Sequence, residues 1–187
     1  MRGSSPLIHC ITNYVTAGDT ANMLLAAGAS PIMADDPSES AEITALAQGL
    51  TLNLGTPSGS RVEAMLRSGA EANRRGIPVV FDPVGAGCSG FRRNSAGEIL
   101  RRARLTAIRG NLSEISYLAG FESRENGVDS SETRITAAEA AQTAAKKLGC
   151  VCAVTGERDV ISDGSRTVTI LLSLIHISEP TRLGMIS

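Results

Sequence analysis

Tryptophan is absent from this chain of 187 residues, and aromatic residues make up only 3% of it. A protein that binds single strands by stacking bases on aromatic side chains is therefore not expected. Basic residues are not in excess either, because 18 Lys and Arg stand against 19 Asp and Glu, for a formal net charge of −1. A basic surface for the phosphate backbone is therefore not expected, and we predict no nucleic-acid partner.

Long apolar runs and closely paired cysteines are also missing. No apolar run approaches the roughly 20 residues of a membrane-spanning helix, and the start of the chain, MRGSS, lacks the apolar core of a secretory signal. The four cysteines form no C-x-x-C pair, and the spacing of Cys150 and Cys152 suits one face of a strand in the core better than a metal site. We therefore predict a reduced, cytoplasmic protein without a membrane segment.

What the chain does contain is a regular alternation of short apolar runs and segments with helical periodicity. Hydrophobic residues make up 42% of the chain and charged residues 20%, which suits one domain with a proper core. Strands are expected at 6–13, 29–34, 50–54, 79–82, 105–111 and 150–155, and helices at 16–27, 39–48, 60–75, 95–103, from 112, and 137–147. The alternation predicts an α/β fold, a mostly parallel sheet with helices on both faces. A hairpin is expected where 159–162 and 166–170 flank Asp163 and Gly164.

Some local expectations follow from single residues. The helix at 39–48 is predicted to turn Ile43, Leu46 and Ala47 towards the core, after a turn and helix cap at 35–38. His9 lies within the first apolar run, where a histidine is more often a core residue with satisfied hydrogen bonds than a ligand.

The stretch VVFDPVGAG at 79–87 is the strongest pointer to a site. Its apolar start predicts a strand buried on both faces, so Asp82 is expected at the carboxyl end of that strand, where open α/β sheets bind ligands. Gly85 and Gly87 would let the backbone turn sharply and approach a ligand closely. An ordinary exit from a strand, with a turn-favouring aspartate, explains the same residues without any ligand.

Segment 172–187 does not continue the pattern. It follows the hairpin without extending the fold, and LSLIHISEPTR at 172–182 resembles the translation of a sequencing-library adaptor. We therefore expect a partial α/β domain at 1–171 and a non-native tail at 172–187.

Four motifs in order carry a family resemblance. They are SPIMA at 30–34, FDPVGAG at 81–87, IRGN at 108–111 with Glu114, and AVTGE at 153–157. Together they resemble hydroxyethylthiazole kinase, a member of the ribokinase-like superfamily, over roughly residues 6–170. The resemblance implies transfer of the γ-phosphoryl group of ATP to the hydroxyl of 4-methyl-5-(2-hydroxyethyl)thiazole, a step in thiamine biosynthesis and salvage.

The resemblance also assigns roles to residues at the expected strand ends. Asp82 and Glu114 would hold Mg²⁺ directly or through water, since Mg²⁺ prefers oxygen ligands, although Glu114 also suits a plain role in the first turn of a helix. Arg109 can fork onto phosphate oxygens, and Thr155 and Gly156 offer ATP a hydroxyl and a close backbone approach.

On the substrate side, the resemblance matches Met33 to a methionine that contacts the thiazole, and Asn13 to a polar position near the hydroxyethyl group. Composition alone would make Met33 a core residue. The family is trimeric, with the thiazole bound where subunits meet, so a homotrimer is implied.

One departure from the family is expected to matter. The Gly-rich turn that supplies the anion hole and the catalytic base of the family has no match in this sequence, so the fold is expected to be incomplete at the C-terminus and the chain inactive, with no catalytic base assigned. Two alternatives stay open. One is another ribokinase-like enzyme, a hydroxymethylpyrimidine kinase or an NAD(P)H-hydrate dehydratase, and the other is a non-catalytic nucleotide-binding fragment.

Overall fold

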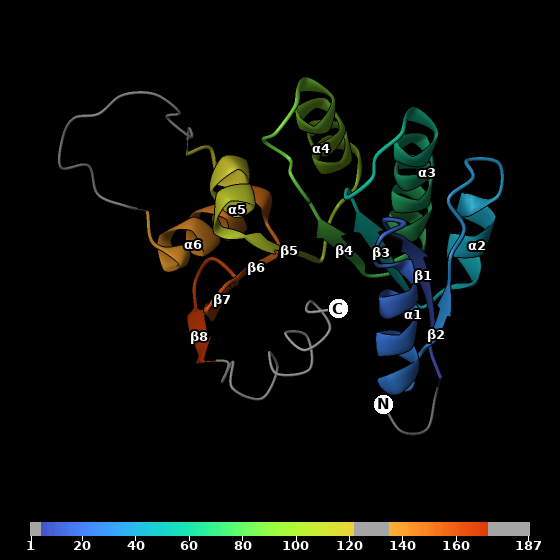
Figure 1. Ribbon diagram of the computed structural model, residues 1–187, viewed down its shortest axis with the longest axis horizontal. Helices are drawn as coiled ribbons and strands as arrows, with labels where there is room; N and C mark the ends of the chain where they lie inside the picture. Colours follow the sequence, from blue (N-terminus) through green and yellow to red (C-terminus); the bar gives the residue numbers. More distant parts are fainter. Residues whose placement is uncertain (1–4, 122–134, 172–187) are drawn as a thin grey trace, which may run out of the picture.

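The computed structural model describes residues 5–121 and 135–171, which form eight strands and six helices (Figure 1). The strands are β1 (Leu7–Ile11), β2 (Ser30–Ile32), β3 (Gly49–Asn53), β4 (Val79–Asp82), β5 (Ala107–Asn111), β6 (Val151–Thr155), β7 (Arg158–Ser162) and β8 (Thr167–Leu171). The helices are α1 (Ala17–Ala26), α2 (Ser40–Leu46), α3 (Gly59–Arg75), α4 (Gly90–Arg102), α5 (Leu112–Ala119) and α6 (Ala137–Leu148). The expected tail at 172–187 lies outside the described residues, among which no helix is both long and apolar enough to cross a bilayer.

All eight strands form one sheet in the order β2-β1-β3-β4-β5-β6-β7-β8. Pairings from β2 through to β6 are parallel, and β7 and β8 add an antiparallel hairpin at one edge. Gly164 turns this hairpin with φ of 93°, a backbone conformation that glycine adopts without strain. The predicted α/β class, the mostly parallel sheet and the hairpin are confirmed.

The handedness of the crossovers decides which face each helix covers. The chain runs from β1 outwards to β2, and then reverses to β3 on the other side of β1. Because crossovers between parallel strands are right-handed, this reversal places α1 on one face and the later helices on the other. Of the helices in the described part of the chain, Figure 1 shows α1 on one side of the sheet and α3, α4, α5 and α6 along the opposite side. Helices thus flank both faces, as predicted, but very unequally.

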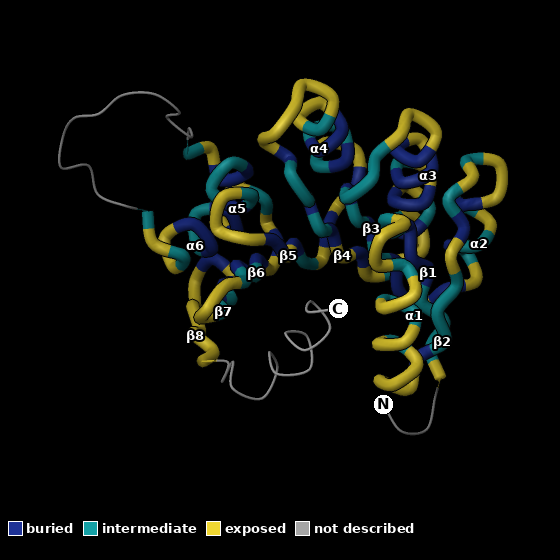
Figure 2. Tube along the Cα trace, viewed as in Figure 1, coloured by how far each residue is buried: buried dark blue, intermediate teal, exposed yellow. Residues whose placement is uncertain are grey.

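The core lies between the sheet and the helices of the more crowded face. Phe81, Ile108 and Val154 are buried on the neighbouring strands β4, β5 and β6 and belong to one hydrophobic cluster. The same cluster contains the buried alanines of α6, a helix that packs against β6 and β7. Figure 2 shows the sheet-facing sides of the helices as buried. The prediction that 79–82 is buried on both faces is wrong, because Val80 points to the other face and is 38% exposed. Burial along β4 therefore alternates between the face that the helices cover and the opposite face, although the sequence here is a continuous apolar run.

Several element boundaries differ from the prediction for local reasons. Strand β2 is shorter than the run 29–34 and lies at the sheet edge. Pro31, which lacks a backbone N–H, is tolerated at an edge because a strand there has a neighbour on one side only. Helix α4 begins five residues before the predicted start at 95, because Ser89 accepts a hydrogen bond from the backbone N–H of Arg92. Helix α2 has no side-chain cap, and Leu46 is 65% exposed, so its predicted inward position is wrong; Ala47 is buried as predicted.

His9 is a fully buried core histidine with both ring nitrogens in hydrogen bonds. Nε2 lies 2.8 Å from the carbonyl oxygen of Ala34, and Nδ1 lies 2.8 Å from Oγ1 of Thr44. A carbonyl only accepts, so Nε2 carries a proton. Oγ1 of Thr44 also lies 2.9 Å from the carbonyl oxygen of Ser40, so its one proton is shared between that oxygen and Nδ1 of the neutral ring. His9 thereby ties β1 to the loop after β2 and to α2. Burial lowers its pKa, although the bond to Ala34 and the charge of Glu39 oppose the shift.

This histidine should make the fold sensitive to mild acid. Because its pKa is lowered in the folded chain, the unfolded chain binds the proton more readily, and stability falls as the pH drops below the ordinary histidine pKa of about 6.5. We expect His9→Gln to lower the free energy of unfolding at pH 7.5 and to flatten its decline between pH 7 and 5, by at most about 1.4 kcal/mol per pH unit. Urea titrations across this range measure both slopes. Equal slopes for the two proteins would contradict the assignment.

Candidate functional site

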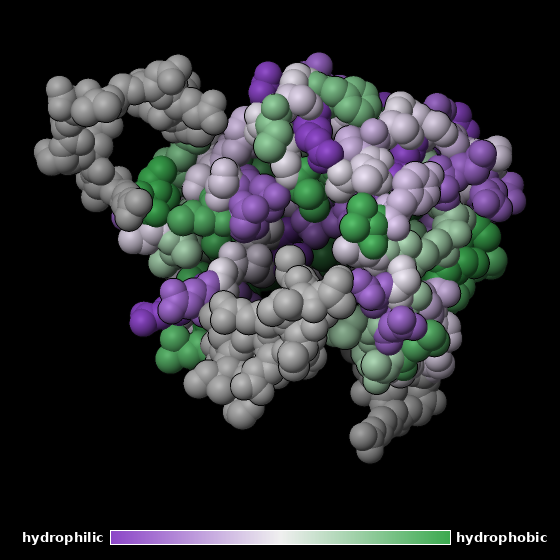
Figure 3. Space-filling view, in the orientation of Figure 1, coloured by the Kyte–Doolittle hydropathy of each residue, from purple (hydrophilic) through white to green (hydrophobic). Residues whose placement is uncertain are grey.

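The polar residues of the predicted site follow parallel strands and therefore meet at one edge of the sheet. Asn13 comes after β1, Asn53 ends β3, Asp82 ends β4 and Thr155 ends β6. The chain leaves β1 and β3 in opposite directions, so a crevice opens between the carboxyl ends of these two strands. Open α/β sheets bind ligands at such a reversal of strand order. Figure 3 shows hydrophilic side chains around a hollow in the middle of this face.

A row of hydrogen bonds runs along this edge from strand to strand. Asn13 Nδ2 donates to Asn53 Oδ1 at 3.0 Å, and Asn53 Nδ2 donates to Asp82 Oδ2 at 2.9 Å. The same Asp82 oxygen accepts from Arg109 Nη1 at 3.3 Å. Asn53 and Asp82 are register partners, and Arg109 stands one residue beyond the Phe81–Ile108 pair, so these three side chains share one face of the sheet.

The carboxylate of Asp82 lies in an environment that disfavours its charge. Its side chain is only 21% exposed, and burial raises its pKa above the ordinary aspartate value. Glu114 adds to this rise as a nearby negative charge, while the charge of Arg109 and hydrogen bonds from Arg109 and Asn53 oppose it. A cation placed between the two carboxylates would offset both the cost of burying the Asp82 charge and its repulsion by Glu114.

Glu114 joins two loops through both of its oxygens. Oε1 accepts from the backbone N–H of Gly85 at 2.9 Å, which fixes the glycine loop after β4. Oε2 accepts from the backbone N–H of Asn111 at 2.9 Å and completes a capping box at the start of α5. The plain helix-capping role considered for Glu114 is therefore present, and each oxygen keeps a further lone pair for a water or an ion.

These residues fit the needs of Mg²⁺. No hydrogen bond within the described part of the chain reaches Asp82 Oδ1, so this oxygen is available, and Glu114 stands close enough to perturb Asp82. The described residues contain no group of three or more His, Cys, Asp or Glu side chains placed to hold a metal. Mg²⁺ commonly takes one or two carboxylates together with substrate phosphates and water, so two carboxylates at an open edge are sufficient.

The residues predicted to meet ATP lie beside this pair. Arg109 uses only Nη1 towards Asp82, and its side chain is 58% exposed, so the rest of the guanidinium can meet phosphate oxygens. Thr155 donates its hydroxyl to the carbonyl of Gly110 at 3.2 Å. The N–H of Gly156 donates to Asp159 Oδ1, and a Cβ at Gly156 would meet only the carbonyl of Arg158 at 3.8 Å. Packing within the described chain therefore leaves open space at Gly156.

The substrate-side residues occupy the other end of the same edge. Met33 follows β2 and is 41% exposed. It therefore does not fill the core, although composition alone would have made it a core residue. Asn13 uses its Oδ1 to accept from the backbone N–H of Thr16 and one N–H for Asn53, which leaves its second N–H available. The structure thus places Met33 near β1 and β2, and Asp82, Arg109 and Thr155 on β4, β5 and β6.

Two arginines that sequence reasoning missed hold the loops of this edge. Arg61 is only 2% exposed, pairs with Asp35 at 2.8 Å, donates to the carbonyl and hydroxyl of Thr56, and lies 3.8 Å from the ring centre of Tyr14. Arg92 donates to the carbonyl oxygens of Gly55 at 2.7 Å and Val84 at 2.6 Å. Each lies on a helix that carries four arginines, most of them exposed, so no sequence signal singles out these two.

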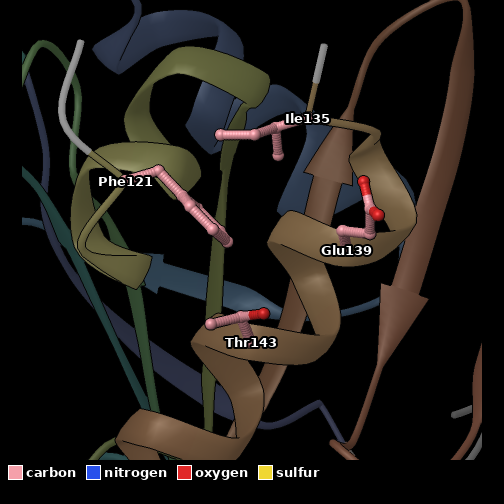
Figure 4. A pocket seen from close by; sticks show the side chains of 4 residues that line it. All are labelled: Phe121, Ile135, Glu139 and Thr143. Carbon is pink, nitrogen blue, oxygen red and sulfur yellow. The ribbon is translucent and has the colours of Figure 1, made fainter. Parts of the chain in front are cut away.

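Two hollows lie near the carboxyl edge on the α5 side. One of about 350 Å³ is bordered by Gly85, Asn111, Glu114 and Tyr117, and thus opens directly beside the two loops that Glu114 joins. Another of about 270 Å³ is lined by Phe121, Ile135, Glu139 and Thr143 (Figure 4). Glu139 is already committed there, because its Oε2 accepts from Thr136. The first hollow, and not the second, belongs to the candidate site.

Comparison with known proteins now identifies the family. The family model described as Hydroxyethylthiazole kinase family matches residues 1–173. The chain belongs to this family. A relative from Ruminiclostridium cellulolyticum named hydroxyethylthiazole kinase is 51% identical over 187 residues, covering 98% of this chain and 68% of the relative. A second relative of the same name, from Clostridium beijerinckii, is 46% identical over 98% of this chain and 68% of its own length.

Solved structures agree with the assignment. The hydroxyethylthiazole kinase protein of Pyrococcus horikoshii OT3 superposes with a TM-score of 0.79 at 38% identity, covering 92% of this chain and 65% of that one. Phosphofructokinase-2 of Escherichia coli matches with a TM-score of 0.54 at 14% identity over 91% of this chain and 62% of that one, a likeness of fold alone. The resemblance to a ribokinase-like kinase family is thus confirmed. The chain spans about two thirds of the length of these relatives.

Asp82 should therefore be a residue that weakens the metal-free fold. Its raised pKa means that the folded chain favours the protonated form of Asp82 over the ionised form. The stability that protonated Asp82 contributes is therefore lost as the pH rises through the pKa of the folded chain. We expect Asp82→Asn to raise the melting temperature at pH 7 in EDTA, with an advantage that shrinks towards pH 4. Scanning calorimetry measures both.

Asp163 provides the matched control. Its carboxylate accepts from Ser165 and Arg166, which lowers its pKa to about 2, so Asp163→Asn should lower the melting temperature at pH 7. If both substitutions lowered it equally, the unfavourable environment assigned to Asp82 would be refuted.

Proposed function

We propose that this chain carries the site for Mg²⁺-dependent transfer of the γ-phosphoryl group of ATP to the hydroxyl of 4-methyl-5-(2-hydroxyethyl)thiazole, a reaction of thiamine biosynthesis and salvage. The observation that supports it most is the meeting of Asp82, Glu114, Arg109 and Thr155 at one sheet edge, in a chain that belongs to the hydroxyethylthiazole kinase family.

The residues divide the work of phosphoryl transfer, which needs positioning and charge neutralisation more than covalent chemistry. Asp82 Oδ1 and the remaining lone pairs of Glu114 would hold Mg²⁺, which when bound neutralises charge on the phosphates. Arg109 reaches phosphate oxygens while its bond to Asp82 keeps it at the edge. Gly85, fixed by Glu114, keeps the glycine loop close to the site.

The acceptor alcohol would lie at the β1–β2 end, against Met33. A thioether packs well on a polarisable aromatic ring, and the second N–H of Asn13 can donate to a hydroxyl. Apolar side chains gather on the surface here and remain uncovered within the described residues. They are Tyr14, Val15, Met23, Leu25 and Met33. Such a patch favours an interface, and we infer that copies of the chain assemble here, as a trimer.

The alternatives are separated by the choice of acceptor. Another ribokinase-like kinase would phosphorylate a hydroxymethylpyrimidine but not the thiazole, and an NAD(P)H-hydrate dehydratase would act on neither. A panel of these acceptors with ATP and Mg²⁺ decides among them. The same assay tests the expectation that the 187-residue chain lacks turnover, since a rate in the ordinary kinase range of about 1–100 s⁻¹ would contradict it. A chain that binds ATP without any turnover fits the non-catalytic alternative.

Arg109 gives a direct test of the nucleotide end. Hydrogen bonds to charged groups contribute about 1.5–3 kcal/mol, so Arg109→Gln should weaken ATP binding roughly 10- to 100-fold in calorimetric titrations with Mg²⁺. Arg101→Gln is the matched control, because Arg101 pairs with Glu98 in the last turn of α4, at the opposite end of that helix from the site. Equal losses in the two variants would contradict the role of Arg109.

The exposed apolar patch gives a test of assembly. Met23 is 72% exposed on α1, so Met23→Glu should leave the fold intact but convert an oligomer into monomers, as measured by light scattering after size-exclusion chromatography. Val168→Glu is the control, because Val168 is also exposed but lies on β8, at the far edge of the sheet. A monomeric parent chain would refute the proposed trimer.

A further inference from the structure

Asn53 has every polar atom of its amide engaged at the centre of the site. Oδ1 accepts from the backbone N–H of Gly55 at 2.9 Å and from Asn13 Nδ2 at 3.0 Å, while Nδ2 donates to Asp82 Oδ2 at 2.9 Å. Asn53 thus stands between the strand that ends in the proposed metal ligand and the loop that leads into α1.

The direction of these bonds follows from one backbone group. The N–H of Gly55 can only donate, so the side of the amide that faces it must be the oxygen. The NH₂ group is then turned to Asp82, and Asn13 must offer its own NH₂ to Asn53 Oδ1. Asn13 Oδ1 is left to accept from the backbone N–H of Thr16. One orientation of each amide therefore satisfies the whole row.

Gly55 contributes through its size. A Cβ at this position would lie 2.6 Å from Asn13 Cβ and 2.8 Å from Asn53 Oδ1, closer than the 3.0 Å that Cβ atoms keep from non-bonded neighbours. Both asparagine side chains therefore pack directly on the glycine backbone. Any larger residue must displace the amides that lead to Asp82.

We propose that Asn53 is a positioning residue for the metal. Its amide, held in one orientation, donates a hydrogen bond to Asp82 Oδ2 and so leaves Asp82 Oδ1 turned towards the place where Mg²⁺ would bind. This inference rests on the proposed function and deepens it. Arg109 shares the same oxygen, so a carboxylate rotation would break two hydrogen bonds at once. Through Asn13 the same row also reaches the substrate-side loop, so the metal end and the acceptor end are fixed together.

The test uses Mn²⁺ alone as the probe, followed by electron paramagnetic resonance on the full 187-residue chain. Removing partners that orient metal ligands commonly costs 10- to 100-fold in affinity, so Asn53→Ala should weaken Mn²⁺ binding by about that factor. Thr51→Val is the matched control, since Thr51 lies two residues earlier on the same strand and face, and should change the affinity by less than about twofold.

Two further variants keep the result independent of folding. Gly55→Ala leaves both asparagines in the sequence but displaces their amides, so it should weaken Mn²⁺ binding to a similar extent. The double exchange Asn53→Asp with Asp82→Asn retains one amide and one carboxylate, so it should recover the thermal stability lost in Asn53→Asp alone but not the Mn²⁺ affinity. An unchanged affinity in both Asn53→Ala and Gly55→Ala would overturn the proposal.

A second readout separates this proposal from the proposed function. Proton exchange of the Asn53 side-chain amide, measured by NMR, should be much slower than that of the exposed Asn94. Equal exchange rates would overturn the locked orientation. A parent chain that binds no Mn²⁺ would refute the proposed metal site and function, while slow exchange in that chain would still support the orientation imposed on Asp82.

Discussion

The site depends on one constraint, the parallel run of the strands from β2 to β6. Parallel strands joined by crossovers end at the same edge, so residues far apart in the sequence meet without any special contact to recruit them. Asn13, Asn53, Asp82, Arg109 and Thr155 come from five different segments and lie along one line. Reversal of the strand order next to β1 then opens the crevice in which this line is accessible.

The negative charge of Asp82 at this edge is energetically unfavourable in the folded chain. Asp82 is mostly shielded from water and close to Glu114, and both effects raise its pKa. Arg109 and Asn53 offset part of this cost by binding one oxygen of the carboxylate. A fold optimised only for stability would have a neutral residue here. The arrangement makes sense for a site that receives a cation together with an anionic ligand.

Loops around the site are held together by the side chains of two arginines, of which Arg61 is buried and Arg92 half-buried. Arg61 gathers the loops after β1, β2 and β3 by binding Asp35 and Thr56 beneath Tyr14. Arg92 binds carbonyl oxygens of the loops after β3 and β4. Guanidinium groups suit this task because five donors in one plane can satisfy several carbonyls at once. Arg61 therefore holds the loops at the proposed substrate end, and Arg92 holds those that lead to the proposed metal end.

The sequence by itself determined the order of strands and helices, the hairpin at Asp163 and Gly164, and the placement of Asp82 at a strand end, because periodicity and turn residues are local properties. It also carried the family motifs. Only the tertiary structure decided that Val80 and Leu46 are exposed, since burial depends on which face the helices cover. Asn53 was visible in the sequence as a polar residue ending a strand, but its bond to Asp82 depends on strand register. Arg61 and Arg92 gave no signal, because their partners lie in other loops that only the folded chain brings together.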